Sequence, residues 1–121
     1  MSTKPKSELT VEQYLKKYSS IAGRYELVDG QVVKMAAETT QHVRFKGRVF
    51  SALSRAVEKA GSNCEVFTDG VSVKINTNKA REPDASVQCG KASDPKSLLI
   101  EKPVILVEVT SPSSGRTDEE E

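Results

Sequence analysis

The chain has 121 residues, enough for one domain whose core needs no disulfide bonds. Charged residues make up 29% and hydrophobic residues 36%, and no apolar run approaches the roughly 18 residues of a membrane span, so a disordered or membrane-spanning chain is excluded. The net charge is only +1, and the polar start lacks the apolar core of a signal peptide. We therefore expect a cytoplasmic protein in which Cys64 and Cys89 stay reduced within strands.

The first half of the chain predicts two helices around a hairpin. Thr10 to Gln13 resembles a capping box, which predicts a short helix to about Tyr18. Asp29-Gly30 predicts a tight turn between two strands, at 24–28 and 31–35. Apolar residues recur at helical spacing from about 39 to 60, which predicts one long helix.

The second half predicts mainly strands. The expected elements are strands at 64–67 and 71–75 joined by Asp69-Gly70, a loop at 76–81, a strand at 84–88, a connector at 90–102 with one helical turn near 97–100, and a strand at 103–109. Together these elements predict a single α/β domain, with an N-terminal helix, a β-hairpin, a long helix and then a mixed β-sheet.

Two carboxylates lie on strand-like runs of this second half. Asp84 follows Pro83, whose fixed φ suits the first position of a strand, and Glu108 comes near the end of the apolar run 104–109. The apolar run 104–109 predicts a buried strand, and a charge within a buried strand is costly unless it is paired or binds a cation. If the two strands are neighbours, both acids converge on an oxygen site for a divalent ion. Alternatively, Asp84 begins a strand and bonds a turn, and Glu108 is a salt-bridged acid on an edge strand.

Basic residues gather in the predicted long helix, at Arg44, Lys46 and Arg48. A basic surface facing an acidic metal site suits a phosphodiester ligand, and the simpler explanation is a solvated, charged helix face. These three side chains cannot share one helical face, so at most a subset contacts DNA. His42, the only histidine, either contacts a phosphate, relays a proton or is a surface residue of the first helical turn.

Several short motifs resemble those of a known family. They are LTVEQYL at 9–15, YELVDG at 25–30, QH at 41–42, PD at 83–84 and EVTSPSS at 108–114. Their order and spacing resemble the PD-(D/E)xK nuclease superfamily, and more narrowly a family of restriction endonucleases that is abundant in cyanobacteria and long catalogued as a domain of unknown function. The resemblance spans almost the whole chain.

This resemblance implies a restriction-endonuclease-like core and Mg²⁺- or Mn²⁺-dependent hydrolysis of phosphodiester bonds in DNA. It implies that Asp84 and Glu108 are catalytic and hold the metal. Glu26 is a third catalytic acid in this interpretation, and the alternative for Glu26 is a cross-strand ion pair with Arg24 or Lys34.

The remaining candidate residues lie around these acids. Thr110 either contributes a backbone carbonyl to the metal or is an ordinary residue at the end of a strand. For contact with nucleic acid we expect His42, Arg44 and Arg48, with the alternatives given above.

The chain departs from the family pattern at the lysine. The superfamily has a lysine two residues after the glutamate, where this chain has Thr110. In the narrower family the lysine lies on a helix after the Ser-Pro segment, and that position would fall just beyond Glu121. We therefore expect a C-terminally truncated domain of weak or no activity, which lacks that helix and the final strands. An exposed sheet edge and the pairing habit of nucleases together predict a homodimer or marginal stability.

Three functions of different classes follow from the sequence. The first is a Mg²⁺-dependent DNA endonuclease. The second is a DNA-binding or regulatory module that keeps the nuclease fold without catalysis. The third is a structural or interaction domain in which the carboxylates are incidental.

Overall fold

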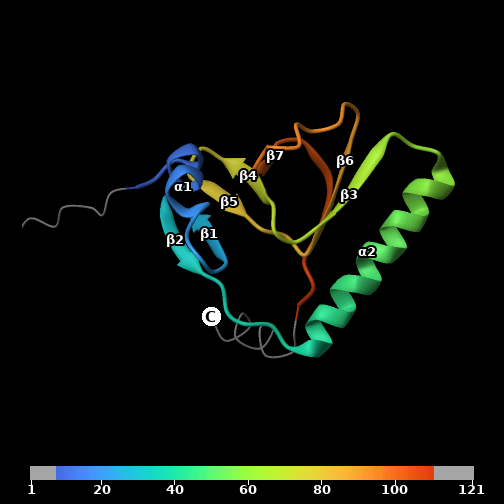
Figure 1. Ribbon diagram of the computed structural model, residues 1–121, viewed down its shortest axis with the longest axis horizontal. Helices are drawn as coiled ribbons and strands as arrows, with labels where there is room; N and C mark the ends of the chain where they lie inside the picture. The colour runs from blue at the N-terminus through green and yellow to red at the C-terminus, as the bar shows by residue number, and fades with distance from the viewer. Residues whose placement is uncertain (1–7, 111–121) are drawn as a thin grey trace, which may run out of the picture.

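The computed structural model describes residues 8–110, which form two helices and eight strands (Figure 1). In chain order these elements are α1 (Val11–Tyr18), β1 (Tyr25–Val28), β2 (Gln31–Lys34), α2 (Thr40–Ala60), β3 (Cys64–Thr68), β4 (Ser72–Asn76), β5 (Lys79–Arg81), β6 (Ala85–Cys89), β7 (Leu99–Ile100) and β8 (Pro103–Val107). The predicted fold class, a mixed α/β domain, is confirmed.

The strands form two sheets. The larger sheet has the order β2-β1-β5-β4-β7, and only its β4–β7 pair is parallel. The smaller sheet has the order β3-β6-β8, with both pairs antiparallel. α1 packs against β1, whereas α2 packs against β3 and β6 and runs along the side of the molecule opposite α1 (Figure 1).

α1 is held by its cap and by the core. The Thr10 hydroxyl accepts a hydrogen bond from the Gln13 amide, and the Gln13 side chain accepts one from the Thr10 amide, so the predicted capping box is present. Val11 and Tyr14 are buried and pack with Leu27 of β1 in the main hydrophobic cluster. Burying a side chain of the size of Val or Leu contributes about 1.5–3 kcal/mol, which orients α1 on the larger sheet.

The hairpin and the second helix also form where the sequence predicts them. Asp29 and Gly30 have φ values of 50° and 79°, which is the type I′ geometry that suits the twist of two paired strands. Thr39 caps α2 through the amide of His42, and Gly61 ends it with a φ of 61°. Lys46 is the only buried residue of α2 within the described part of the chain, so this helix contributes little to the hydrophobic core.

Two predictions about the second half are wrong. The predicted loop at 76–81 contains β5, which pairs with both β4 and β1 and buries Ala80. The predicted helical turn near 97–100 is absent, and Leu99 and Ile100 instead form β7, a short strand parallel to β4. In each case a distant strand supplies the partner, which local pattern does not reveal. The two strands predicted on either side of Asp69-Gly70 are present as β3 and β4, and they belong to different sheets.

The two cysteines are not reduced as predicted. Cys64 and Cys89 face each other across the β3–β6 pair and form a disulfide. Disulfides are rare in cytosolic proteins, so the expectation of a cytoplasmic location loses the support it took from reduced cysteines. No helix within residues 8–110 is both long and apolar enough to cross a membrane.

The strand that leads to Glu108 is an edge strand. β8, which ends one residue before Glu108, pairs with β6, which begins one residue after Asp84. The prediction that the apolar run is buried is wrong, because Val104 and Leu106 are 60% and 45% exposed. Along its outer edge β8 has no strand partner within the described residues.

Candidate active site

Asp84 and Glu108 leave the smaller sheet at the same end. Asp84 precedes β6, Glu108 follows β8, and the register pairs Ala85 with Val107 between them. The Asp84 amide donates a hydrogen bond to the carbonyl of Val107 at 2.9 Å, and the Val109 amide donates one to Asp84 Oδ2 at 2.6 Å. These bonds fix the Asp84 carboxylate beside the backbone that carries Glu108.

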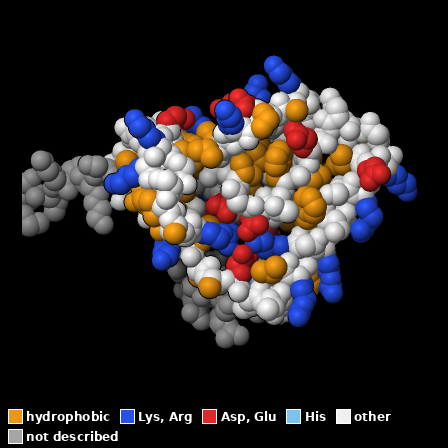
Figure 2. Space-filling view, in the orientation of Figure 1, with side chains coloured by type: hydrophobic (Ala, Val, Ile, Leu, Met, Phe, Trp, Pro, Cys, Tyr) orange, Lys and Arg blue, Asp and Glu red, His pale blue; other side chains and the backbone are white. Residues whose placement is uncertain are grey.

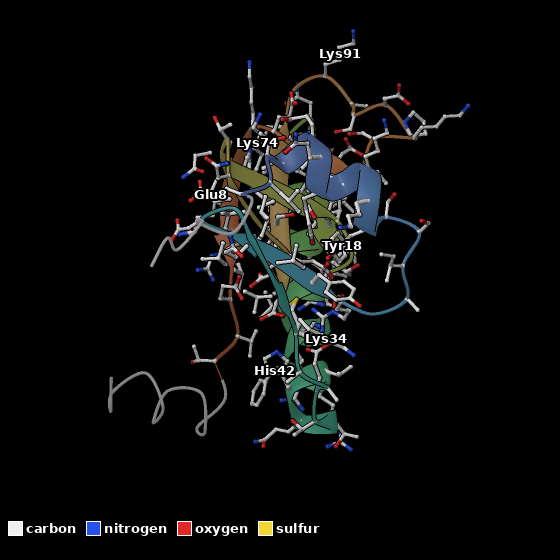
Figure 3. All side chains as sticks on the ribbon, turned by 90° about the vertical axis from the view of Figure 1, so that its left-hand side faces the viewer. Glu8, Tyr18, Lys34, His42, Lys74 and Lys91 are labelled. Atoms are coloured by element: carbon white, nitrogen blue, oxygen red, sulfur yellow. A yellow bond between two sulfur atoms is a disulfide. The ribbon has the colours of Figure 1, made fainter. Side chains whose placement is uncertain are left out.

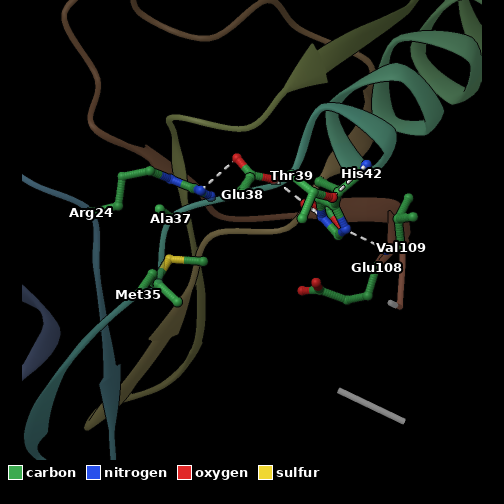
Figure 4. Close-up of a pocket in the computed structure, with 10 residues that line it drawn as sticks. Arg24, Met35, Ala37, Glu38, Thr39, His42, Glu108 and Val109 are labelled. Carbon is green, nitrogen blue, oxygen red and sulfur yellow. Dashed lines mark hydrogen bonds and ion pairs between the residues drawn. The ribbon is translucent and has the colours of Figure 1, made fainter. Parts of the chain in front are cut away.

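Both acids line one hollow of about 360 Å³ (Figure 4). Residues 35–39, which lead into α2, form another part of its wall together with Arg24 and His42. Figure 2 shows acidic and basic side chains gathered in the hollowed middle of this face. The hollow therefore combines open space with a high density of charge.

Glu108 lies in an acidic environment. Partial burial, together with the nearby Asp84 and Glu26 carboxylates, raises the pKa of Glu108, and Arg81 and His42 offset only part of the increase. The residue as a whole remains exposed to solvent. Ionised acids that repel one another in this way are stabilised by a cation placed between them.

Glu26 approaches the same acids from β1. Its Oε2 accepts a hydrogen bond from the Glu82 amide at 2.9 Å, and its Oε1 lies 3.9 Å from Arg81 Nη1. The ion-pair partner is therefore Arg81 of the adjacent strand β5, not Arg24 or Lys34. Glu26 acts on Glu108 electrostatically but is not one of the residues that line the hollow.

His42 faces the acids from the first turn of α2. Its Nε2 lies 3.1 Å from Glu38 Oε2 and 3.5 Å from Asp84 Oδ1, and its side chain is 18% exposed. In the side view of Figure 3, His42 lies near one end of the molecule, and Lys91 of the β6–β7 connector lies at the opposite end. Because its side chain is mostly buried and lines the hollow, His42 is not on an open helix surface.

A network of ion pairs that the sequence did not predict surrounds these residues. Lys46 Nζ lies 2.7 Å from Glu38 Oε2, 2.6 Å from Asp69 Oδ2 and 3.7 Å from Asp84 Oδ1. Arg24 adds a 2.7 Å contact to Glu38 Oε1 and a 3.3 Å contact to Asp69. Asp69, which was predicted only as a turn residue, is therefore part of the network.

Lys46 stays charged in spite of its burial. Burial by itself lowers the pKa of this lysine, but hydrogen bonds and attraction from Asp69 and Glu38 outweigh it and raise the pKa above the ordinary value. The sequence contains one signal that points to this arrangement. His42 and Lys46 are four residues apart and so share one side of α2, and Glu38, four residues before His42, lies just ahead of the N-cap Thr39.

The other predicted site residues lie outside the hollow. Arg44 and Arg48 are exposed on α2, and Arg48 lies over the ring of Phe45 at 5.6 Å. Thr110 is exposed and is the last described residue. None of the three lines the hollow.

One group among the described residues has the composition of a metal site. Glu38, His42 and Asp84 each offer a ligand atom, and these atoms all lie within 4.8 Å of one another. The predicted pair, Asp84 and Glu108, shares only Asp84 with this group.

Residues 11–121 match the sequence family Uma2, which is described as "Putative restriction endonuclease". The chain belongs to this family. The resemblance noted from the sequence motifs is confirmed. The motif residues Ser111 to Ser114 and the acidic residues Asp118 to Glu121 lie outside the described part of the chain.

Two further comparisons agree with this membership. An uncharacterized protein of Synechocystis sp. is 28% identical over 115 residues, which cover 94% of this chain and 60% of the relative. The crystal structure of a putative nuclease of DUF820 from Anabaena variabilis superimposes with a TM-score of 0.67 at 16% identity, covering 93% of this chain and 64% of that one. At this identity the second match shows the fold alone. The chain thus spans less than two thirds of both proteins.

The chain lacks lysine at the position that the resemblance to the PD-(D/E)xK pattern implies. Thr110 stands where the superfamily has lysine, whereas Lys46 approaches Asp84 from α2. The described residues therefore do place an ammonium group beside the acids, although a different element supplies it.

Proposed function

We propose that this domain is a DNA endonuclease that hydrolyses phosphodiester bonds with a divalent ion, Mg²⁺ or Mn²⁺, held by Asp84 and Glu108. The main support is geometric, because these acids lie at the same end of two neighbouring strands and line one hollow. Membership of the Uma2 family supports the class of reaction.

The charges around the hollow fit a divalent cation. Four carboxylates share the two cations Arg24 and Lys46, which leaves a formal charge of −2. These carboxylates are Glu38, Asp69, Glu82 and Asp84. Glu108, with its raised pKa, adds a further acid beside them. Mg²⁺ binds through one or two carboxylates and keeps several waters, so the open hollow suits it.

Each residue of this site has a separate role in the proposed hydrolysis. A bound divalent ion supplies a Lewis acid that lowers the pKa of water and neutralises charge on a phosphate. Asp84 is oriented for this ion by the Val109 amide, and the Thr110 carbonyl is a third proposed ligand. Lys46 contributes fixed positive charge next to Asp84. Glu26 acts on Glu108 through its charge.

DNA binding is assigned to α2. Arg44 and Arg48 are exposed on the helix that also carries His42, but they project from the side of α2 away from His42 and Lys46, so they would bind phosphates of DNA that extends across α2 from the hollow. A homodimer through the outer edge of β8, where Val104 and Leu106 are exposed, would bring two such sites together.

The alternative is a nuclease-fold DNA-binding or regulatory module without catalysis. Thr110 in place of the superfamily lysine favours it. It remains the weaker candidate because Lys46 supplies an ammonium group beside Asp84.

A plasmid-nicking assay tests the proposal. It compares the wild type with Asp84→Ala, Glu108→Ala and the control Glu101→Ala, whose side chain is exposed and lies outside the hollow. The proposal predicts nicking that needs Mg²⁺ or Mn²⁺, that is lost in the first two variants and that is kept in the control. Because the relatives are longer, the assay includes a chain continued past Glu121. DNA binding without nicking in both lengths would establish the alternative.

A further inference from the structure

We propose that Glu38, His42 and Asp84 form a second metal position in the hollow, which binds a transition-metal ion such as Zn²⁺ in preference to Mg²⁺. It rests on the proposed function only through Asp84, which both positions share.

The geometry of the three side chains points to a shared ion. Nε2 of His42 lies 3.1 Å from Glu38 Oε2 and 3.5 Å from Asp84 Oδ1, and all three ligand atoms fall within 4.8 Å of one another. Zinc binds imidazole nitrogen and carboxylate oxygen at about 2.0–2.2 Å, so ligand atoms around one ion lie roughly 3–3.5 Å apart. The observed spacing needs only small side-chain movements to reach this arrangement.

The two oxygens of the Asp84 carboxylate differ in how tightly they are held. The Asp84 side chain is 7% exposed, and its Oδ2 is satisfied by the Val109 amide. Oδ1 accepts no hydrogen bond from the described residues, and the nearest charged nitrogens, on His42 and Lys46, lie 3.5 and 3.7 Å away. Oδ1 is therefore the less tightly held oxygen of this carboxylate, and Asp84 lines the hollow.

The surrounding contacts orient the other carboxylate. Arg24 donates to Glu38 Oε1 at 2.7 Å, and Lys46 donates to both Glu38 oxygens at 2.8 and 2.7 Å. Hydrogen bonds of this kind hold metal-ligating carboxylates in place in known metal sites. Glu38 Oε2 also lies on the side that His42 Nε2 approaches.

The imidazole decides which ion is preferred. Mg²⁺ favours oxygen ligands in octahedral geometry, whereas imidazole nitrogen suits Zn²⁺ and other transition metals. One histidine and two carboxylates would supply three ligands of kinds that zinc accepts and leave the fourth position of a tetrahedral ion open. Selectivity for Zn²⁺ over Mg²⁺ therefore follows from His42.

Because His42 is the only histidine, its ring can be observed without ambiguity in untagged protein. The experiment titrates ¹⁵N-labelled protein with Zn²⁺ and with Mg²⁺ and follows the ring nitrogens of His42 by NMR. We expect Zn²⁺ to shift Nε2 and to saturate at one ion per chain, and Mg²⁺ to leave it unchanged. Glu38→Gln and His42→Gln should each weaken Zn²⁺ binding at least tenfold by calorimetry, and Glu58→Gln, an exposed residue of the same helix, should not.

The outcomes separate this inference from the proposed function. Zn²⁺ binding that leaves the His42 ring unchanged, or the absence of saturable binding, would overturn the second metal position even if Mg²⁺ supports nicking. Conversely, a Zn²⁺-dependent shift of Nε2 in a protein that never nicks DNA would support the metal position and reject the nuclease. Backbone NMR spectra of each variant confirm that it is folded.

Discussion

Replacing Lys46 by methionine tests the ion-pair network that fixes α2 against the acids. Methionine keeps the length of the side chain and removes its charge, which leaves Glu38 and Asp69 without their 2.7 and 2.6 Å partner. Breaking a buried ion pair costs about 3–5 kcal/mol. Here the two acids are 20% and 28% exposed and keep Arg24, so screening by solvent reduces the expected loss to about 2 kcal/mol.

Urea unfolding measures this loss. With a slope of about 1.5 kcal/mol per molar urea, the unfolding midpoint of Lys46→Met should lie about 1.3 M below that of the wild type. The control is Lys59→Met, an exposed change in the last turn of α2, which should change the free energy of unfolding by no more than about 0.5 kcal/mol. Since folding raises the pKa of Lys46 above 10.5, its contribution is complete at neutral pH and is lost only as the pH rises through the folded value. A midpoint for Lys46→Met equal to that of the wild type would refute the reasoning.

Three other changes have defined outcomes. Glu108→Gln should raise the melting temperature of the metal-free protein at pH 7, because the raised pKa of Glu108 shows that its negative charge is unfavourable in the folded protein. The gain in melting temperature should fade as the pH falls towards 4.5, where Glu108 becomes protonated. A lower melting temperature at pH 7 would contradict this reasoning. Thr10→Ala should cost about 1 kcal/mol in urea unfolding by removing the cap of α1, and no measurable change would mean that the cap is unimportant. Arg44→Ala and Arg48→Ala should each weaken DNA binding whatever the DNA sequence, and should reduce by about one the slope of the logarithm of the binding constant against the logarithm of salt concentration. Lys91→Ala is the control and should leave that slope unchanged. The same slope in all three variants would exclude α2 as the DNA surface.

The features that the sequence predicted correctly depend on near neighbours in the chain. The Thr10–Gln13 box begins α1, and the positive φ values of Asp29 and Gly30 close the hairpin, so both follow from a few adjacent residues. The lengths of α2 and of the strands beside Asp84 and Glu108 likewise follow from local periodicity. This is why the strands that carry the candidate site could be located before the structure was known.

The features that the sequence did not predict depend on distant partners. Ala80 is buried because β5 lies between β1 and β4, and a strand of three residues has too little periodicity to be recognised. Lys46 reads as one charge of a solvated helix until Asp69, 23 residues later, meets its ammonium group. Cys64 and Cys89 bond because the β3–β6 register places them opposite each other.

The central claim is that Asp84 and Glu108 share a divalent ion, and a crystal soaked in Mn²⁺ tests it most directly. The account predicts an anomalous-scattering peak about 2.0–2.5 Å from an oxygen of each carboxylate. Both side chains ordered with no peak between them, or with their carboxylates turned to opposite sides of the sheet, would contradict it.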